Sequence, residues 1–122
     1  MADQKYDFGR GGRMLVSRAY LGLQRDEMAA ALRVSPSSYQ RWENGQGGIP
    51  QGVWTEVEKL TEAFDQRVND LLEQAGGGAL KVRIWRGKKP DAPFPGMWHR
   101  IVSEAMRENP QIEPVFPEDD KE

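Results

Sequence analysis

Residues 34–45 read VSPSSYQRWENG and specify one short helix together with both of its ends. Ser35 is a favourable N-cap residue, and Pro36 suits the first helical position. Gly45 suits the left-handed residue that often follows the end of a helix. The segment therefore predicts a helix of about two turns that begins after Ser35 and ends before Gly45.

The two aromatic side chains of this short helix predict which of its faces is buried. Tyr39 and Trp42 are three residues apart, so they lie on the same face and can pack against a neighbouring helix. The polar side chains then face outward: Ser37, Ser38, Gln40 and Arg41. A core helix would carry apolar residues at these positions, so the pattern favours a helix that presents a polar face to a partner.

Apolar periodicity predicts two more helices before this segment. The first spans residues 13–21 and the second spans residues 25–32. At the start of the second helix, Glu27 can reach back to the backbone of Gln24 and cap the helix. The inward-facing candidates of the first helix are Met14, Leu15 and Ala19.

The rest of the chain predicts a long helix, a small appendage and two polar ends. An apolar stripe with steps of three and four residues indicates a fourth helix over residues 52–75, which would complete a domain spanning residues 13–75. Residues 79–117 indicate a β-α-β appendage, which is too small to bury a core easily alone and must dock on the fourth helix or pair with a second subunit. Residues 1–12 are expected to form a flexible arm, and residues 118–122 a disordered acidic tail.

Composition excludes several classes of protein. The chain has no cysteine and one histidine, which excludes disulfides, thiolate metal sites and histidine-rich metal sites. We therefore expect no metal and no cofactor, and no nucleophile–base pair indicates an enzyme. No apolar run approaches the roughly 20 residues of a membrane span, and no signal-peptide pattern opens the chain. The expected location is cytoplasmic, with no membrane partner.

Charge is unevenly distributed along the chain, although the net charge is only -2. Residues 79–107 carry seven basic and two acidic side chains, whereas residues 108–122 carry one basic and six acidic side chains. The local field can therefore favour an anionic partner despite the net charge. Five basic residues could either touch a DNA backbone or balance the acidic fourth helix, and both readings stay open: Lys81, Arg83, Arg86, Lys88 and Lys89.

The segment LGLQRDEMAAALRVSPSSYQRWENG resembles the Cro-like, or XRE-type, helix-turn-helix regulators of phages and bacteria. The resemblance covers roughly residues 13–72, and its anchors are Gly22-Leu23, Gln24-Arg25, Met28-Ala29, Val34-Ser35 and Trp42-Glu43-Asn44-Gly45. The continuation GGIPQGVW and the layout of the appendage resemble, more weakly, the anti-CRISPR-associated phage autorepressors. The implied fold is mainly α: a lambda-repressor-like helix-turn-helix bundle with a long fourth helix and a small C-terminal β-α-β appendage.

The resemblance also implies roles for individual residues. Contacts to DNA bases fall to Pro36, Ser37, Ser38, Gln40 and Arg41, and contacts to phosphate to Gln24, Arg25, Asn44, Gly45 and Gln46. Arg41 is the main candidate for base reading, because arginine can bind guanine O6 and N7 with two hydrogen bonds. Pro36 departs from the usual polar residue, so it is limited to apolar contact. Arg18 and Glu43 match a buried structural ion pair.

Arg33 stands in the turn where the family often has glycine. A positive φ at an arginine costs roughly 1–2 kcal/mol. The sequence therefore predicts either a slightly strained turn or a turn of different geometry.

The expected function is a sequence-specific DNA-binding transcriptional regulator, specifically a dimeric repressor or autorepressor that recognises an inverted repeat in double-stranded DNA. A homodimer is expected, and no enzymatic activity. Two alternatives stay open: an antitoxin that also binds a toxin protein, and a protein-interaction adaptor that does not bind DNA. RNA is an alternative ligand for the same basic surface.

Overall fold

The computed structural model describes residues 5–120, and this part of the chain is mainly helical. It divides into two compact units, the first ending at Thr61 and the second beginning at Glu62. The boundary falls inside the long helix α4, Gln51–Ala75, so each unit contains one part of this helix. None of the helices within residues 5–120 is long and apolar enough to cross a membrane.

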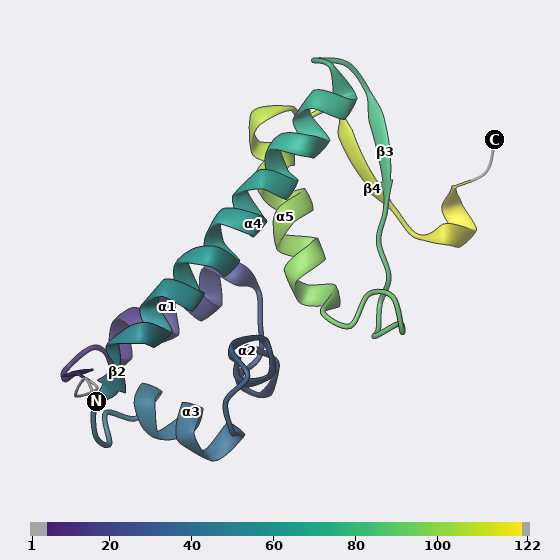
Figure 1. The fold of residues 1–122 in the computed structure, drawn as a ribbon. Coiled ribbons are helices and arrows are strands. Elements are labelled where there is room, and N and C mark those ends of the chain that lie inside the picture. The colour runs from purple at the N-terminus through teal and green to yellow at the C-terminus, as the bar shows by residue number, and fades with distance from the viewer. Residues whose placement is uncertain (1–4, 121–122) are drawn as a thin grey trace. The chain divides into compact units, whose positions relative to one another are not determined.

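The first unit packs three short helices with the beginning of α4. Helix α1 spans Gly11–Leu21, α2 spans Arg25–Leu32 and α3 spans Pro36–Glu43. Figure 1 shows that only a short turn separates α2 from α3. The buried apolar side chains of this unit are Met14, Leu21, Leu23, Met28, Ala29, Leu32, Tyr39, Trp42, Ile49 and Val57. The three predicted short helices and the burial of both aromatic residues are confirmed.

The two turns between the short helices each use a left-handed residue. Gly22 follows α1 with φ 71°, which glycine adopts without steric cost. Arg33 follows α2 with φ 61° and ψ 42°, a left-handed conformation that costs energy at a residue with a Cβ atom. Of the two possibilities that the sequence left open, the strained turn is therefore the one observed.

The first helix buries a different face from the one expected. Met14 and Leu21 are fully buried, but Leu15 is 41% exposed and Ala19 is exposed as well. The prediction that Leu15 and Ala19 point inward is therefore wrong. The inward stripe of α1 runs through Met14, Arg18 and Leu21 in steps of four and three residues, because the side chain of Arg18 turns toward a buried carboxylate of α3.

The residues before α1 belong to the folded unit, although the sequence suggested an arm up to Gly12. Strand β1, Tyr6–Asp7, pairs antiparallel with strand β2, Ile49–Pro50. The side-chain amide of Gln51 donates a hydrogen bond of 2.9 Å to Asp7 Oδ1 and reinforces this pairing. Helix α1 also begins earlier, at Gly11. The remaining part of the expected arm, residues 1–4, lies outside the described residues.

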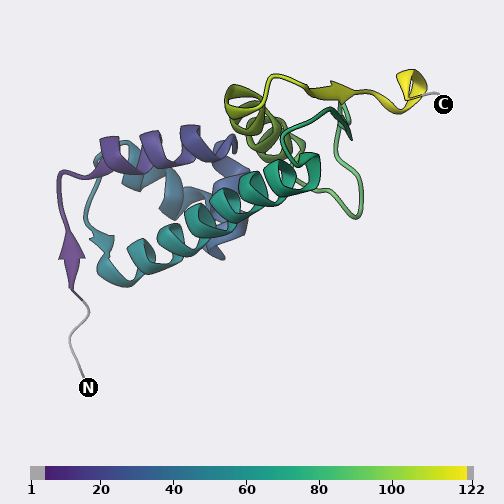
Figure 2. The same ribbon diagram turned by 90° about the horizontal axis from the view of Figure 1, so that it is seen from above.

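The second unit combines the end of α4 with a β-α-β segment. Strand β3, Leu80–Arg83, is followed by helix α5, Pro95–Glu108, and by strand β4, Ile112–Val115. The two strands pair in parallel, with Leu80 opposite Ile112 and Arg83 opposite Val115. They lie side by side in both views (Figures 1 and 2). Parallel neighbours require a long crossover connection, which α5 supplies.

This β-α-β segment packs on the last part of α4, which is one of the two arrangements that the sequence predicts for it. The buried side chains of the unit come from α4, both strands and α5: Phe64, Leu71, Val82, Ile101, Val102, Ala105 and Ile112. The guanidinium of Arg67 on α4 also lies 4.9 Å from the centre of the Trp98 ring on α5. The buried side chain of Asn109, directly after α5, joins this helix to the residues before β3, because its amide donates a hydrogen bond of 3.0 Å to Gly78 O.

The acidic tail is folded over its described part, contrary to the expected disorder. Residues Pro117–Asp119 form a 3₁₀ turn, and ion pairs connect Glu118 to Arg86 and Asp120 to Arg83. Arg83 of β3 and Arg86 of the next loop therefore pair with this tail. The final two residues of the predicted tail, 121–122, lie outside the described residues.

Candidate nucleic-acid interface

Helix α3 begins with a cluster of hydroxyl groups around its N-cap. The Oγ of Ser35 accepts a hydrogen bond of 3.1 Å from the backbone N–H of Ser38. This bond satisfies one of the N–H groups that the start of a helix leaves without a partner. The hydroxyls of Ser37 and Ser38 lie 3.3 and 2.9 Å from the same oxygen. Pro36 occupies the first turn, where its missing N–H costs nothing.

The end of α3 is fixed by a left-handed glycine, as predicted. Gly45 has φ 76°, and its N–H donates to Trp42 O at 3.2 Å. The N–H of Gln46 donates to Arg41 O at 2.8 Å. These two bonds form a Schellman motif, which satisfies the last carbonyl groups of the helix and turns the chain sharply away. The side chains of Asn44 and Gln46 are thereby held beside the last turn of α3.

The buried face of α3 fixes the direction of its polar face. Tyr39 is fully buried and Trp42 is 8% exposed, and their rings meet edge to face with centroids 6.1 Å apart. Edge-to-face aromatic contact is favourable beyond the area that it buries. Because this face is anchored, the exposed side chains of Ser37, Gln40 and Arg41 are directed away from the core.

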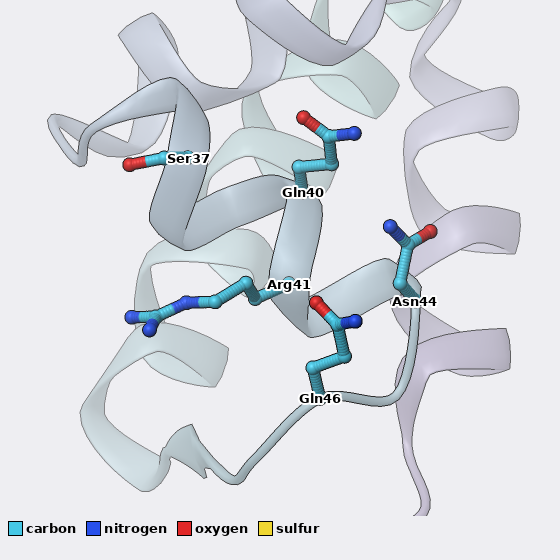
Figure 3. A pocket seen from close by; sticks show the side chains of 5 residues that line it. All are labelled: Ser37, Gln40, Arg41, Asn44 and Gln46. Atoms are coloured by element: carbon cyan, nitrogen blue, oxygen red, sulfur yellow. The ribbon is translucent and has the colours of Figure 1, made fainter.

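Five of the predicted contact residues line one open hollow on α3 and the following loop (Figure 3). They are Ser37, Gln40, Arg41, Asn44 and Gln46. Figure 3 shows Ser37 and Arg41 pointing to one side of the helix and Gln40 and Asn44 to the other, with Gln46 below Arg41. The hollow thus collects hydroxyl, amide and guanidinium groups, which donate and accept hydrogen bonds.

The other predicted contact residues lie outside this hollow. Pro36 is exposed at the start of α3, Ser38 is half-buried in the capping cluster, and Gly45 is in the turn. Gln24 and Arg25 stand at the start of α2, where the Gln24 N–H donates to Glu27 Oε1 at 2.8 Å. This is the predicted cap of α2, and it leaves Gln24 and Arg25 exposed beside the N-terminus of that helix.

A buried carboxylate connects the three short helices behind this surface. The side chain of Glu43 is fully buried, and Arg18 donates two hydrogen bonds to it, from Nε to Oε2 at 2.6 Å and from Nη2 to Oε1 at 3.1 Å. The hydroxyl of Tyr39 also donates to Glu43 Oε2. Nε of Arg25 lies 3.3 Å from Oε1. The implied Arg18–Glu43 pair is therefore present and has two partners that the sequence reading did not include.

These contacts shift the titration of all three central groups. Burial by itself would raise the pKa of the Glu43 carboxyl, but the hydrogen bonds from Arg18 and Tyr39 and the charges of Arg18 and Arg25 outweigh it and hold this pKa below its ordinary value. The hydrogen bond to Glu43 raises the pKa of the Arg18 guanidinium. Burial, followed by the hydrogen bond to Glu43, raises the pKa of the Tyr39 phenol. Glu43 is therefore ionised at neutral pH.

A close backbone approach between α1 and α3 was not recognised in the sequence. A Cβ atom placed on Gly11 would lie 2.7 Å from Trp42 O and 2.9 Å from Glu43 O. Only glycine permits this approach, whereas nothing lies within 4 Å of the corresponding position on Gly12. The spacing of glycines gave no signal for this contact, because it depends on a partner about thirty residues later in the chain.

The chemistry available in the hollow is hydrogen bonding and one fixed positive charge. Guanidinium and amide groups match the acceptors and donors on base edges and phosphate oxygens. Within the described residues, no group of three histidine, cysteine, aspartate or glutamate side chains is placed to hold a metal ion.

A comparison with known protein families identifies the same part of the chain. A family model described as a helix-turn-helix domain matches residues 11–73, about half of the chain. The matched range begins with α1 and ends near the end of α4. No curated protein matches the chain.

Proposed function

We propose that this chain, which belongs to the helix-turn-helix domain family, regulates transcription. It does so by binding double-stranded DNA through the outward face of α3. The observation that carries this proposal is the orientation of that helix. Its aromatic residues are buried, and its polar residues line an exposed hollow of hydrogen-bonding groups. In helix-turn-helix proteins, the second helix enters the major groove in this orientation.

Base reading is assigned to five residues of α3. Arg41 carries most of the discrimination, because bidentate contact with guanine is worth roughly 1–3 kcal/mol. Ser37 points to the same side of α3 as Arg41 and Gln40 to the other side, and both supply further donors and acceptors. Ser38 has a smaller role, since its hydroxyl contacts Ser35. Pro36 can touch only apolar groups, such as a thymine methyl.

Phosphate contact is assigned to residues on both sides of α3. Gln24 and Arg25 lie at the N-terminus of α2, where backbone N–H groups and the helix dipole favour an anion. Asn44, Gly45 and Gln46 form the turn after α3, where a glycine lets a phosphate come close to the backbone. These contacts set the position of the protein on DNA and carry no base preference.

The finer part of the proposal is a homodimer that represses, including at its own promoter as the phage autorepressors do. A two-fold dimer places two recognition helices about 34–36 Å apart, one turn of DNA, so the operator is an inverted repeat. Sedimentation of the protein alone and with operator DNA tests the dimer. A monomer on a site without symmetry would contradict it.

The proposal is tested by fluorescence anisotropy with duplex DNA over a series of salt concentrations. Phosphate contacts predict that affinity falls steeply as salt rises. We expect Arg41→Ala to reduce the preference for operator over random duplex. We expect Arg25→Ala to weaken binding to both duplexes similarly. Because Arg25 also contacts Glu43, the folded state of this variant is checked by circular dichroism. Wild-type-like binding by both variants would overturn the site, and absence of salt-sensitive binding would favour the adaptor alternative.

A further inference from the structure

The second unit carries a basic surface that the proposed function does not use. Strand β3 and the loop after it contain five basic residues, here called the basic strand surface: Lys81, Arg83, Arg86, Lys88 and Lys89. Val82 is buried, so Lys81 and Arg83 share the opposite, exposed face of β3. Nζ of Lys89 lies 4.1 Å from the ring centre of Trp85, which holds this ammonium group in place.

The acidic segment after β4, residues 117–120, occupies the two arginines of this surface. Nε of Arg83 contacts Asp120 Oδ2 at 2.7 Å. Nη1 of Arg86 contacts both carboxylate oxygens of Glu118, at 2.9 and 3.3 Å. The Arg86 guanidinium also stacks 3.5 Å from the ring centre of Phe116, immediately before this segment.

These ion pairs are exposed and therefore easily exchanged. The side chains of Arg83 and Arg86 are 53% and 63% exposed in their pairs. Exposed pairs contribute little to stability, so their loss leaves the unit folded. A carboxylate and a phosphate offer a guanidinium the same arrangement of two oxygen acceptors. The segment thus fills sites that suit phosphate oxygens.

We propose that the basic strand surface is a second contact for the phosphate backbone of duplex DNA, and that residues 117–120 compete with DNA for it. Duplex DNA carries one negative charge per roughly 1.7 Å of helix axis, and a short acidic segment cannot match this charge density. The competition lowers affinity for DNA of any sequence and so increases the relative weight of base contacts. This inference rests on the proposed DNA binding but uses none of its residues.

The test compares two double variants on random-sequence duplex DNA. Glu118→Gln with Asp120→Asn frees Arg83 and Arg86. The matched control, Glu104→Gln with Glu108→Gln, changes the net charge equally and breaks the Arg100–Glu104 pair on α5. We expect the first variant to gain about tenfold in affinity, and its plot of log affinity against log salt to steepen by about 2, since each phosphate contact adds about 0.9. The control should change little.

A further variant and a second ligand make the outcome decisive. Adding Arg83→Gln and Arg86→Gln to the first variant should abolish the gain. An equal gain in the control, or no gain at all, would overturn the inference, and so would a gain for single-stranded RNA without one for duplex. If Arg41 still sets the sequence preference while the variant with Glu118→Gln and Asp120→Asn binds like wild type, only this inference fails. If that variant gains affinity but Arg41→Ala leaves the sequence preference unchanged, only the α3 assignment fails.

Discussion

Arginine and carboxylate groups meet in both units, but in opposite surroundings. In the first unit, Arg18, Arg25 and Tyr39 converge on the fully buried carboxylate of Glu43. In the second unit, Glu118 is 57% exposed in its pair with Arg86. The bidentate pair of Arg18 with Glu43 cannot be exchanged without exposing the buried carboxylate, whereas the exposed pair can. The same chemical pair therefore acts as a structural support in one unit and as a replaceable contact in the other.

The largest difference between the units is expected from removing one carboxylate in each. Glu43→Ala leaves the Arg18 guanidinium without its buried partner and should lower the free energy of unfolding by about 3–5 kcal/mol. Glu118→Ala should leave the denaturation midpoint unchanged, because both members of its pair are exposed. Urea denaturation measures both. Similar losses in the two variants would remove the distinction between the clusters.

Acid should weaken the first unit through the same carboxylate. The pKa of Glu43 is lower in the folded state than its unfolded value of about 4.3, so its contribution is present above that pH and is lost as pH falls through the folded pKa. Tyr39→Phe removes one hydrogen bond that lowers this pKa, so in that variant the loss should be smaller and should end at a higher pH. Denaturation of both proteins from pH 7 to pH 3 checks this, and coincident profiles would contradict it.

The close approach of α1 to α3 should tolerate no added methyl group. Gly11→Ala places a Cβ 2.7 Å from a backbone carbonyl oxygen and should cost about 1–3 kcal/mol of stability. Gly12→Ala has open space and replaces a helical glycine, so it should be neutral or stabilising by about 0.5–1 kcal/mol. Thermal unfolding of the pair provides the comparison. Equal melting temperatures would mean that α1 does not approach α3 this closely.

The smallest effect concerns the turn between α2 and α3. Arg33→Gly relieves a left-handed arginine at φ 61° and should stabilise the first unit by about 1 kcal/mol. Arg33→Ala removes the same side chain but keeps a Cβ, so it should retain the strain. A rise in melting temperature shared by both variants would trace the effect to the charge of Arg33 instead.

Local chemistry explains which features the sequence could predict. Ser35, Pro36 and Gly45 act within a few residues of their positions, so they determined both ends of α3 and, with Tyr39 and Trp42, the direction of its polar face. The features that the sequence reading missed join distant segments: the pairing of β1 with β2, the approach of Gly11 to α3, and the contact of Arg25 with Glu43. No local pattern encodes such pairings. The four-residue spacing of Tyr39 and Glu43 is the one signal that could have revealed a further partner.

Selection of bound sequences from a random duplex pool, carried out with wild type and Arg41→Ala, tests the central claim most directly. If the outward face of α3 reads base edges, the wild type enriches a defined half-site that contains a guanine, and Arg41→Ala loses roughly tenfold or more in discrimination at that position while other positions persist. Identical enriched sites for the two proteins, or no enrichment by the wild type, would contradict the account.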